Sequence, residues 1–186
     1  MKGLQSLMLR KNRINQLVFS SDLSLLGLGL SHLDLGHNQI ESLPPNFGAV
    51  FPKLISLNLR ANKLKSVQGL QNHQLLDELD VSDNQISKIP KRLVLPKLTK
   101  LLINGNALKS IRNFNYHFPA LEVLEARNNQ VMNLKDLEFL KPGSPMEEIY
   151  LLGNPVYHLK IAEVIQSQLP SIQRVDDLLI CSNERL

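Results

Sequence analysis

The residues best suited to proton transfer or metal binding in this 186-residue chain are its five histidines. They are His32, His37, His73, His117 and His158. No two of them have the close spacing that metal sites usually show, so we expect no metal site. His32 and Asp34 are two residues apart and would share one face of a strand, where a proton could pass between them. A solvated pair is the default interpretation of that spacing.

Two other features could support nucleophilic catalysis or nucleotide binding. Cys181 is the only cysteine, and the sequence predicts no basic partner that would activate its thiol. Gly27-Leu28-Gly29 lacks the third glycine and the strand-then-helix setting of a dinucleotide-binding loop. We therefore predict that the protein is not an enzyme and uses no cofactor, metal or small-molecule substrate.

An internal repeat determines which elements carry these residues. Seven times along the chain, an asparagine follows a run of alternating leucine-type residues, and these seven form a predicted structural ladder: Asn12, Asn38, Asn62, Asn84, Asn106, Asn129 and Asn154. The steps between them are 26, 24, 22, 22, 23 and 25 residues, which is the period of leucine-rich repeats. Seven repeats in register indicate a solenoid rather than a closed globular fold.

The local pattern of each repeat explains how such a solenoid would be held together. In the stretch x-Leu-x-Leu-x, alternate side chains point to opposite faces of a strand, so the leucines enter the core. The asparagine amide can both donate and accept hydrogen bonds where the chain turns, and it would satisfy buried backbone groups there. An apolar residue two positions later completes each coil: Ile14, Ile40, Leu64, Ile86, Leu108, Val131 and Val156.

The segments between strands predict short elements. The 22-residue steps leave room for little more than a 3₁₀ turn, whereas residues 135–140 could form a short helix. From Tyr157 apolar residues recur at helical spacing until Pro170, and residues 169–176 could close over the last strand. We predict a single structural domain, with seven repeats over 1–156 and a capping helix and cap motif over 157–186.

The segments Gly153-Asn154-Pro155-Val156 and Leu169-Pro170-Ser171-Ile172-Gln173-Arg174-Val175-Asp176 flank the predicted helix. With the 22-residue coils, they resemble intracellular leucine-rich-repeat proteins of the sds-twenty-two-like class with a C-terminal cap. That class includes a protein phosphatase one regulatory subunit, a spliceosomal A-prime protein, acidic nuclear phosphoproteins and a dynein arm light chain. The resemblance implies an α/β leucine-rich-repeat solenoid, a curved right-handed coil. A parallel β-sheet lines its concave face, and short helices, 3₁₀ turns and loops lie on its convex face.

Composition favours an intracellular protein, in the nucleus or the cytoplasm. A single cysteine allows no intrachain disulfide, no Asn-x-Ser/Thr sequon occurs, and no apolar run is long enough to insert into a membrane. The net charge is +4 and the pI is near 9.2. These charges are dispersed along the sequence, which favours a solvated surface over a dedicated nucleic-acid patch. We therefore expect no direct nucleic-acid binding.

The concave face is the predicted binding surface, because its solvent-facing positions form columns across the strands. Its candidate partner-binding residues are Arg10, Asp34, Asn58, Arg60, Asp80, Leu102, Val123, Glu125, Arg127, Tyr150 and Leu152. Leucine, valine and tyrosine are unusual at solvent-facing positions, so Leu102, Val123, Tyr150 and Leu152 could form an apolar interface. The alternative is that Tyr150 and Leu152 pack under the cap. The neighbouring arginines and carboxylates could contact a partner or compensate one another.

These features predict a protein–protein interaction scaffold or adaptor that binds a macromolecular partner, most simply another protein. Two alternatives stay open: a subunit of a ribonucleoprotein complex that grips an RNA-binding protein, and a regulatory subunit of a phosphatase or other enzyme. Three of the candidate residues on the concave face, Asp34, Asp80 and Glu125, are acidic and do not favour RNA there.

Overall fold

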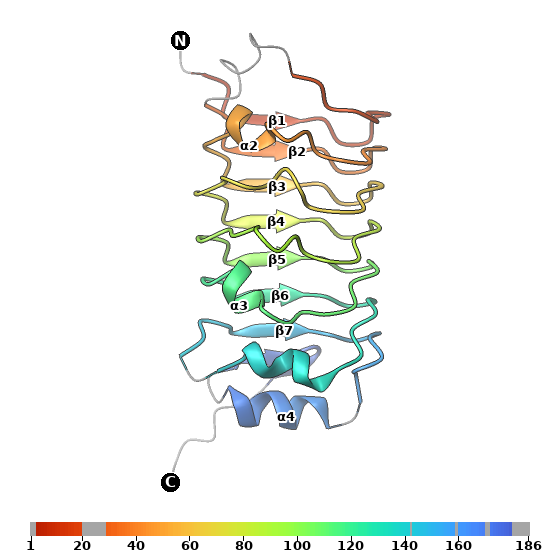
Figure 1. Ribbon diagram of the computed structural model, residues 1–186, viewed down its shortest axis with the longest axis vertical. Coiled ribbons are helices and arrows are strands. Elements are labelled where there is room, and N and C mark those ends of the chain that lie inside the picture. The colour runs from red at the N-terminus through yellow and green to blue at the C-terminus, as the bar shows by residue number, and fades with distance from the viewer. Residues whose placement is uncertain (1–2, 20–28, 142, 159, 170–171, 180–186) are drawn as a thin grey trace.

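The computed structural model describes residues 3–19, 29–141, 143–158, 160–169 and 172–179. Within these residues one sheet of nine strands follows chain order from β1 to β9. Its first seven strands are parallel, one per repeat: β1 (Ser6–Met8), β2 (His32–Asp34), β3 (Ser56–Asn58), β4 (Glu78–Asp80), β5 (Lys100–Leu102), β6 (Val123–Glu125) and β7 (Glu148–Tyr150). The coils stack along the long axis of the molecule (Figure 1). The predicted solenoid is confirmed.

The middle residue of each strand points into the core, as the alternation predicts. The strand register aligns Leu57 with Leu79 and Leu79 with Leu101, and each of these three side chains is 1% exposed. Burial on this scale supplies the main favourable free energy of folding, because apolar surface is removed from water. Each coil therefore covers the core of its neighbour.

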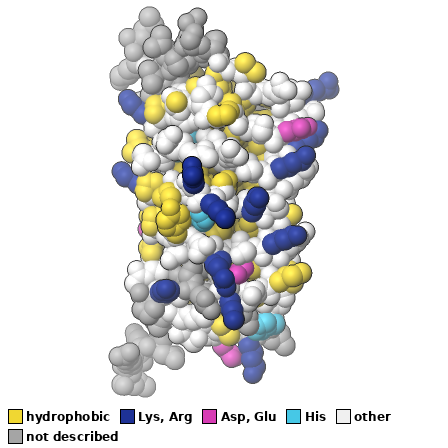
Figure 2. Space-filling model, in the orientation of Figure 1, with side chains coloured by type: hydrophobic (Ala, Val, Ile, Leu, Met, Phe, Trp, Pro, Cys, Tyr) yellow, Lys and Arg dark blue, Asp and Glu magenta, His cyan; other side chains and the backbone are white. Residues whose placement is uncertain are grey.

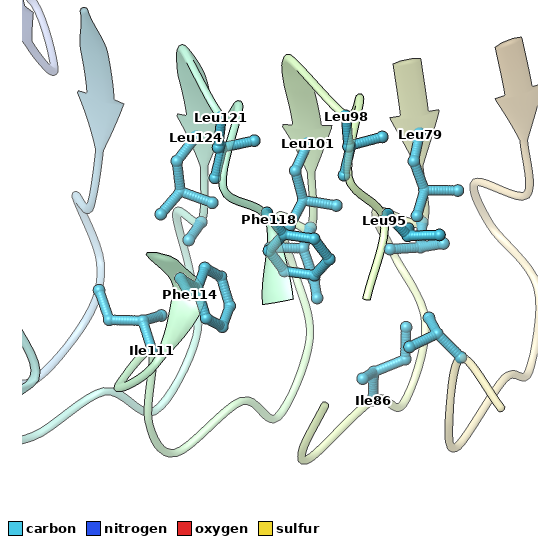
Figure 3. Close-up of a cluster of buried hydrophobic side chains, with 14 of the residues drawn as sticks. Leu79, Ile86, Leu95, Leu98, Leu101, Ile111, Phe114, Phe118, Leu121 and Leu124 are labelled. Atoms are coloured by element: carbon cyan, nitrogen blue, oxygen red, sulfur yellow. The ribbon is translucent and has the colours of Figure 1, made fainter. Parts of the chain in front are cut away.

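Short helices lie on the side opposite the sheet (Figure 1). They are α2 (Phe47–Val50), α3 (Phe114–His117), the 3₁₀ helix η1 (Leu134–Phe139) and α4 (Ile161–Gln168). The two 22-residue steps hold only turns between their strands, as predicted. Figure 3 shows the rings of Phe114 and Phe118 among the core leucines. The two rings pack edge to face, with their centroids 5.2 Å apart.

The asparagine ladder joins each coil to the one before it. The Nδ2 of Asn129 donates to the carbonyl oxygen of Ala126 in its own coil at 3.1 Å and to that of Ile103 in the preceding coil at 2.9 Å. Its Oδ1 accepts a hydrogen bond from the amide of Leu108 at 3.0 Å. The same bonding pattern recurs at Asn38, Asn62, Asn84, Asn106 and Asn154. These bonds satisfy backbone groups of two neighbouring coils, whereas the Nδ2 of Asn12 donates to the carbonyls of Leu9 and Arg10 in its own coil.

The C-terminal end departs from the prediction in detail. The helix begins at Ile161 rather than near Tyr157, and the segment at 134–139 is a 3₁₀ helix. After α4, β8 (Arg174–Val175) extends the parallel sheet, and β9 (Leu178–Leu179) pairs antiparallel with β8. The sequence pattern did not predict β9. The division at 156/157 stays a prediction, and Gly27, Leu28 and Cys181 lie outside the described residues.

Candidate functional site

The outward-pointing side chains of β1 to β7, with the residues that follow each strand, form a surface that we call the sheet face. Its first column is Ser6, His32, Ser56, Glu78, Lys100, Val123 and Glu148. Its middle column is Met8, Asp34, Asn58, Asp80, Leu102, Glu125 and Tyr150. The parallel register of neighbouring strands therefore aligns both columns across the sheet face.

Backbone bonds continue the alignment beyond the strands. The amide of Leu59 donates to the carbonyl of Asp80 at 2.7 Å, and the amide of Ala61 donates to that of Ser82 at 2.9 Å. Equivalent bonds occur in the other coils, so a last column is aligned as well: Arg10, Gly36, Arg60, Ser82, Asn104, Arg127 and Leu152. The sheet face therefore presents three ordered columns.

Hydrogen bonds to the backbone hold the middle column in place. The Oδ1 atoms of Asp34, Asn58 and Asp80 each accept from the backbone amide two residues later, at 2.8, 2.9 and 2.9 Å. Such local bonds fix a side chain against the turn that follows it. Each of the two carboxylates keeps its other oxygen without a partner in the described part of the chain, where it can accept from a binding partner.

A shallow hollow of about 220 Å³ lies over β3, β4 and β5. It brings together three predicted site residues, Asn58, Asp80 and Leu102, with two charged residues of the first column, Glu78 and Lys100. None of these charged side chains forms an ion pair within the described residues. The hollow therefore combines unpaired charge with a half-exposed leucine.

The arginines of the last column pair with residues other than the predicted carboxylates. Arg60 Nε lies 2.9 Å from Asp83 Oδ2. Arg127 reaches across to the cap, where Nε lies 3.0 Å from Asp176 and Nη2 lies 3.1 Å from Asp177. The third arginine, Arg10, bonds to His37 at 3.0 Å. The positive charges of Arg60 and Arg127 are therefore compensated, but by Asp83, Asp176 and Asp177 rather than by the carboxylates of the middle column.

Tyr150 belongs to a network at the cap. Its hydroxyl donates to Glu148 at 2.5 Å, and the guanidinium of Arg127 lies 4.5 Å from the ring centre. Arg174 of β8 approaches Glu148 at 3.7 Å. Burial raises the pKa of the Tyr150 phenol to about 12, and the hydrogen bond and charge of Glu148 add to that effect. The geometry favours the interpretation in which Tyr150 packs with the cap.

The strand neighbours directly opposite Leu102, Val123 and Tyr150 are charged residues. In the middle column Glu125 stands between Leu102 and Tyr150, and Val123 is paired with Lys100 and Glu148. Leu152 is 44% exposed, whereas the other three are half-buried. Apolar contacts on this face therefore alternate with charged ones.

The structure does not join His32 and Asp34, the pair predicted to share a strand face, by a hydrogen bond. His32 bonds instead to the Ser31 hydroxyl, and Asp34 to the Gly36 amide. Among the residues that the structure describes, no three or more histidines, cysteines or carboxylates are grouped as a metal site. The same part of the chain contains no helix of the length and hydropathy needed to cross a bilayer.

The carboxylates that pair with Arg60 and Arg127 were not predicted from the sequence pattern. Asp83 precedes a ladder asparagine, at a position where the backbone is left-handed in every coil: Lys11, His37, Ala61, Asp83, Gly105, Asn128 and Gly153 have φ between 53° and 80°. Asp176 has the same conformation in the cap, with φ 51°. Its carboxylate accepts from the amides of Leu151 and Leu152 at 3.0 and 3.1 Å. The signal in the sequence that could have pointed to Asp176 was its place in the cap motif, seven residues after Leu169.

Comparison with known families agrees with this architecture. Residues 53–185 match the family described as leucine-rich repeat, and residues 29–72 match the family described as leucine rich repeats in two copies. The first match alone covers more than half of the chain.

Two relatives show the range of proteins that contain such a segment. The chain is 32% identical to Toll-like receptor 2 of Boselaphus tragocamelus over 152 residues, 81% of this chain and 18% of the receptor. It is 30% identical to the U2 small nuclear ribonucleoprotein A' of Arabidopsis thaliana over 149 residues, 76% of this chain and 57% of that protein. The chain thus spans less than two thirds of either relative.

Solved structures share the fold over nearly the whole chain. An internalin of Listeria monocytogenes superposes with a TM-score of 0.76 at 26% identity, covering 95% of this chain and 48% of the internalin. Internalin C2 of the same organism gives a TM-score of 0.75 at 22% identity, covering 92% of this chain and 70% of that chain.

Proposed function

Because the chain belongs to the leucine-rich-repeat family, whose members generally mediate protein–protein interaction, we propose that it is a scaffold or adaptor that binds a protein partner on its sheet face. The fold and the family are typically interaction modules rather than enzymes. One observation carries the proposal: in the described part of the chain, the hollow over β3 to β5 holds the charged residues Glu78, Asp80 and Lys100 without ion pairs, beside the half-exposed Leu102.

The hollow suits a protein surface with mixed chemistry. Asp80 and Glu78 favour a cationic side chain of the partner, and the half-exposed Leu102 offers an apolar contact beside them. The backbone bond of Asp80 fixes its carboxylate before binding, so less conformational entropy is lost when a partner docks. Leu102 is expected to contribute because its exposed apolar surface is removed from water when a partner docks.

Quantitative binding to variants tests this proposal. Proteins captured by the intact chain are identified by mass spectrometry, and the dissociation constant of the purified partner is then measured. Leu102→Ala and Asp80→Lys are each expected to weaken binding at least about tenfold, which corresponds to about 1.4 kcal/mol. Leu75→Ala is the matched control, because Leu75 is 39% exposed outside the strands.

Unchanged binding to Leu102→Ala and Asp80→Lys would overturn the proposed surface. An equal loss of affinity in Leu75→Ala would show a general effect on the fold, which would also count against the proposed surface. Tyr150→Ala is a less direct probe, because it removes the contacts with Glu148 and Arg127 that join the last repeat to the cap.

A ribonucleoprotein-subunit role is the second candidate, and the 30% identity to U2 small nuclear ribonucleoprotein A' favours it. The middle column carries Asp34, Asp80 and Glu125, so on this face the partner would be a protein of the particle rather than its RNA. Ribonuclease treatment of captured complexes separates the two cases. Retention of the partner after digestion is the expected result.

We also propose membership of the sds-twenty-two-like class and an intracellular location. The buried side chains of Leu169, Ile172 and Val175 support the cap part of that resemblance, because they close the core beyond β7 as the motif predicts. Microscopy of the tagged full-length protein tests the location, and signal outside the nucleus and cytoplasm would contradict it.

A further inference from the structure

The side of the solenoid opposite the sheet face carries a strong excess of positive charge. In three successive coils the connecting segments 63–75, 85–97 and 107–120 contain no aspartate or glutamate. They contain eight basic residues: Lys63, Lys65, Lys88, Lys91, Arg92, Lys97, Lys109 and Arg112. Figure 2 shows this side, where blue Lys and Arg side chains run through the middle of the face and magenta acidic ones are sparse.

Stacking of the coils brings these distant residues together. The amide of Gln85 donates to the carbonyl of Leu64 at 2.9 Å, and the amide of Ala107 donates to that of Ile86 at 3.0 Å. The backbones of 63–65, 85–87 and 107–109 therefore lie side by side. Lys65 and Lys109 flank Ser87 in one column across three coils.

A hollow of about 480 Å³ lies between the second and third of these segments. Lys88 and Lys91 line it from one coil, and Lys109 and Arg112 line it from the next. The hydroxyl-bearing residues Ser87 and Ser110 complete its polar wall. We call Lys65 and these four cations, Lys88, Lys91, Lys109 and Arg112, the basic surface.

The positive charge of the basic surface is nearly uncompensated. Its five side chains belong to exposed residues, and only Arg112 forms an ion pair with a described residue, Asp136, at a long 3.9 Å. Four lysines without a carboxylate neighbour repel one another, which opposes folding. A bound polyanion would remove that repulsion.

We propose that the basic surface binds the phosphate backbone of a single-stranded nucleic acid. Lysine binds phosphate oxygens as a flexible point charge, and arginine makes two-pronged contacts with phosphate as well as with carboxylate. The five cations come from three successive coils, and the exposed ring of Tyr116 on α3 adds a surface on which a nucleotide base could stack, so the chemistry favours a nucleic acid over an acidic peptide. A clustered basic face on a chain with a pI near 9.2 is the electrostatic footprint of nucleic-acid binding.

The basic surface fits a membrane less well. Peripheral binding to a bilayer needs apolar side chains that enter the lipid as well as cations. Within the hollow, Ile89 is half-buried and Phe114 is buried, so neither is free to insert. The exposed ring of Tyr116 lies on α3 beside His117, where a base could stack on it.

The test measures binding of the full chain to a fluorescent mixed-sequence strand of about 20 nucleotides, as RNA and as DNA, across a salt series. The double variant Lys88→Glu/Lys109→Glu is expected to weaken binding at least about tenfold, and the slope of log Kd against log salt should fall by about 1.4. The matched control is Lys53→Glu/Lys160→Glu, which changes the net charge equally at two exposed residues outside the basic surface. The control should change Kd less than about threefold.

Several results would overturn the inference. Equal loss of binding in both double variants would mean that only net charge matters. Tighter binding of a polyglutamate peptide, or of vesicles containing phosphatidylserine, would assign the surface to a different class of partner.

The same measurements distinguish the two nucleic acids. Tighter binding to DNA than to RNA of the same sequence would identify DNA as the ligand, and tighter binding to RNA would identify RNA. Either result is consistent with phosphate recognition. This test does not involve the hollow of the sheet face, so either proposal can fail alone.

Discussion

The sheet face and the basic surface are built by the same repeat, but their charged side chains have different surroundings. On the sheet face Asp34 and Asp80 bond to backbone amides, and Arg60 and Arg127 pair with carboxylates. On the basic surface only Arg112 has an ion-pair partner among the described residues. Fixed side chains provide a defined shape, whereas unpaired lysines provide a diffuse field. The sheet face therefore offers charges at fixed positions, whereas the basic surface offers an excess of one charge on mobile side chains.

Both surfaces depend on the shared core, so the largest effect is expected from breaking it. Leu79 is 1% exposed and lies between two neighbouring coils (Figure 3). Leu79→Ala should lower the free energy of unfolding by about 2 to 5 kcal/mol, because it leaves a cavity. Urea denaturation measures the change. A stability equal to the parent's would contradict the register on which both surfaces rest.

The asparagine ladder aligns the two surfaces, and its loss should have the next largest effect. Asn129 is 6% exposed and bonds to two coils, so Asn129→Ala should cost about 1 to 3 kcal/mol by leaving buried backbone groups without partners. Asn12 is exposed and bonds only to carbonyls of its own coil, so Asn12→Ala should stay within about 0.5 kcal/mol. Equal costs at the two positions in urea denaturation would show that the bonds between coils add nothing.

The cap end of the sheet face is expected to respond to alkaline pH. The pKa of Tyr150 is about 12 in the folded protein and near 10 when unfolded, so between these values the unfolded state ionises first and stability falls as pH rises. Glu148→Gln removes the charge that contributes to the shift and should return the pKa partway toward 10. Difference absorbance titration against Tyr150→Phe isolates this phenol. An unchanged pKa in Glu148→Gln would show that the charge of Glu148 does not contribute to the shift.

The smallest effect is expected from an exposed ion pair of the sheet face. The Arg60 and Asp83 side chains are 51% and 47% exposed, so Arg60→Ala should change stability by less than about 0.5 kcal/mol. Thermal melting measures the change, and Lys63→Ala, which removes an exposed cation without an ion pair, is the control. A loss above 1 kcal/mol for Arg60→Ala alone would mean that the pair orders the last column.

The sequence predicted what the repeat determines directly. The ladder asparagines and the columns follow from a fixed period, because each residue type recurs at the same place in every coil. The partners of Arg60 and Arg127 could not be found in this way, since Asp83 and Asp176 sit at turn positions whose direction depends on left-handed backbone. The 3₁₀ form of residues 134–139 likewise depends on packing, because propensity alone does not distinguish it from an α-helix.

The sequence pattern did not predict the basic surface, for a different reason. Its lysines are spread over residues 65–109, so no cluster of positive charge is found along the sequence. Only the stacking of coils places Lys65, Ser87 and Lys109 in one column. In a solenoid, charge has to be counted by face rather than along the chain.

Lysine footprinting of the native protein tests the separation of the two surfaces most directly. The chain is acetylated with and without the single-stranded RNA, and the protection of each lysine is measured by mass spectrometry. We expect protection of Lys65, Lys88, Lys91 and Lys109, while Lys100 in the hollow of the sheet face keeps its reactivity. Protection of Lys100 equal to that of Lys88 and Lys109 would contradict this expectation.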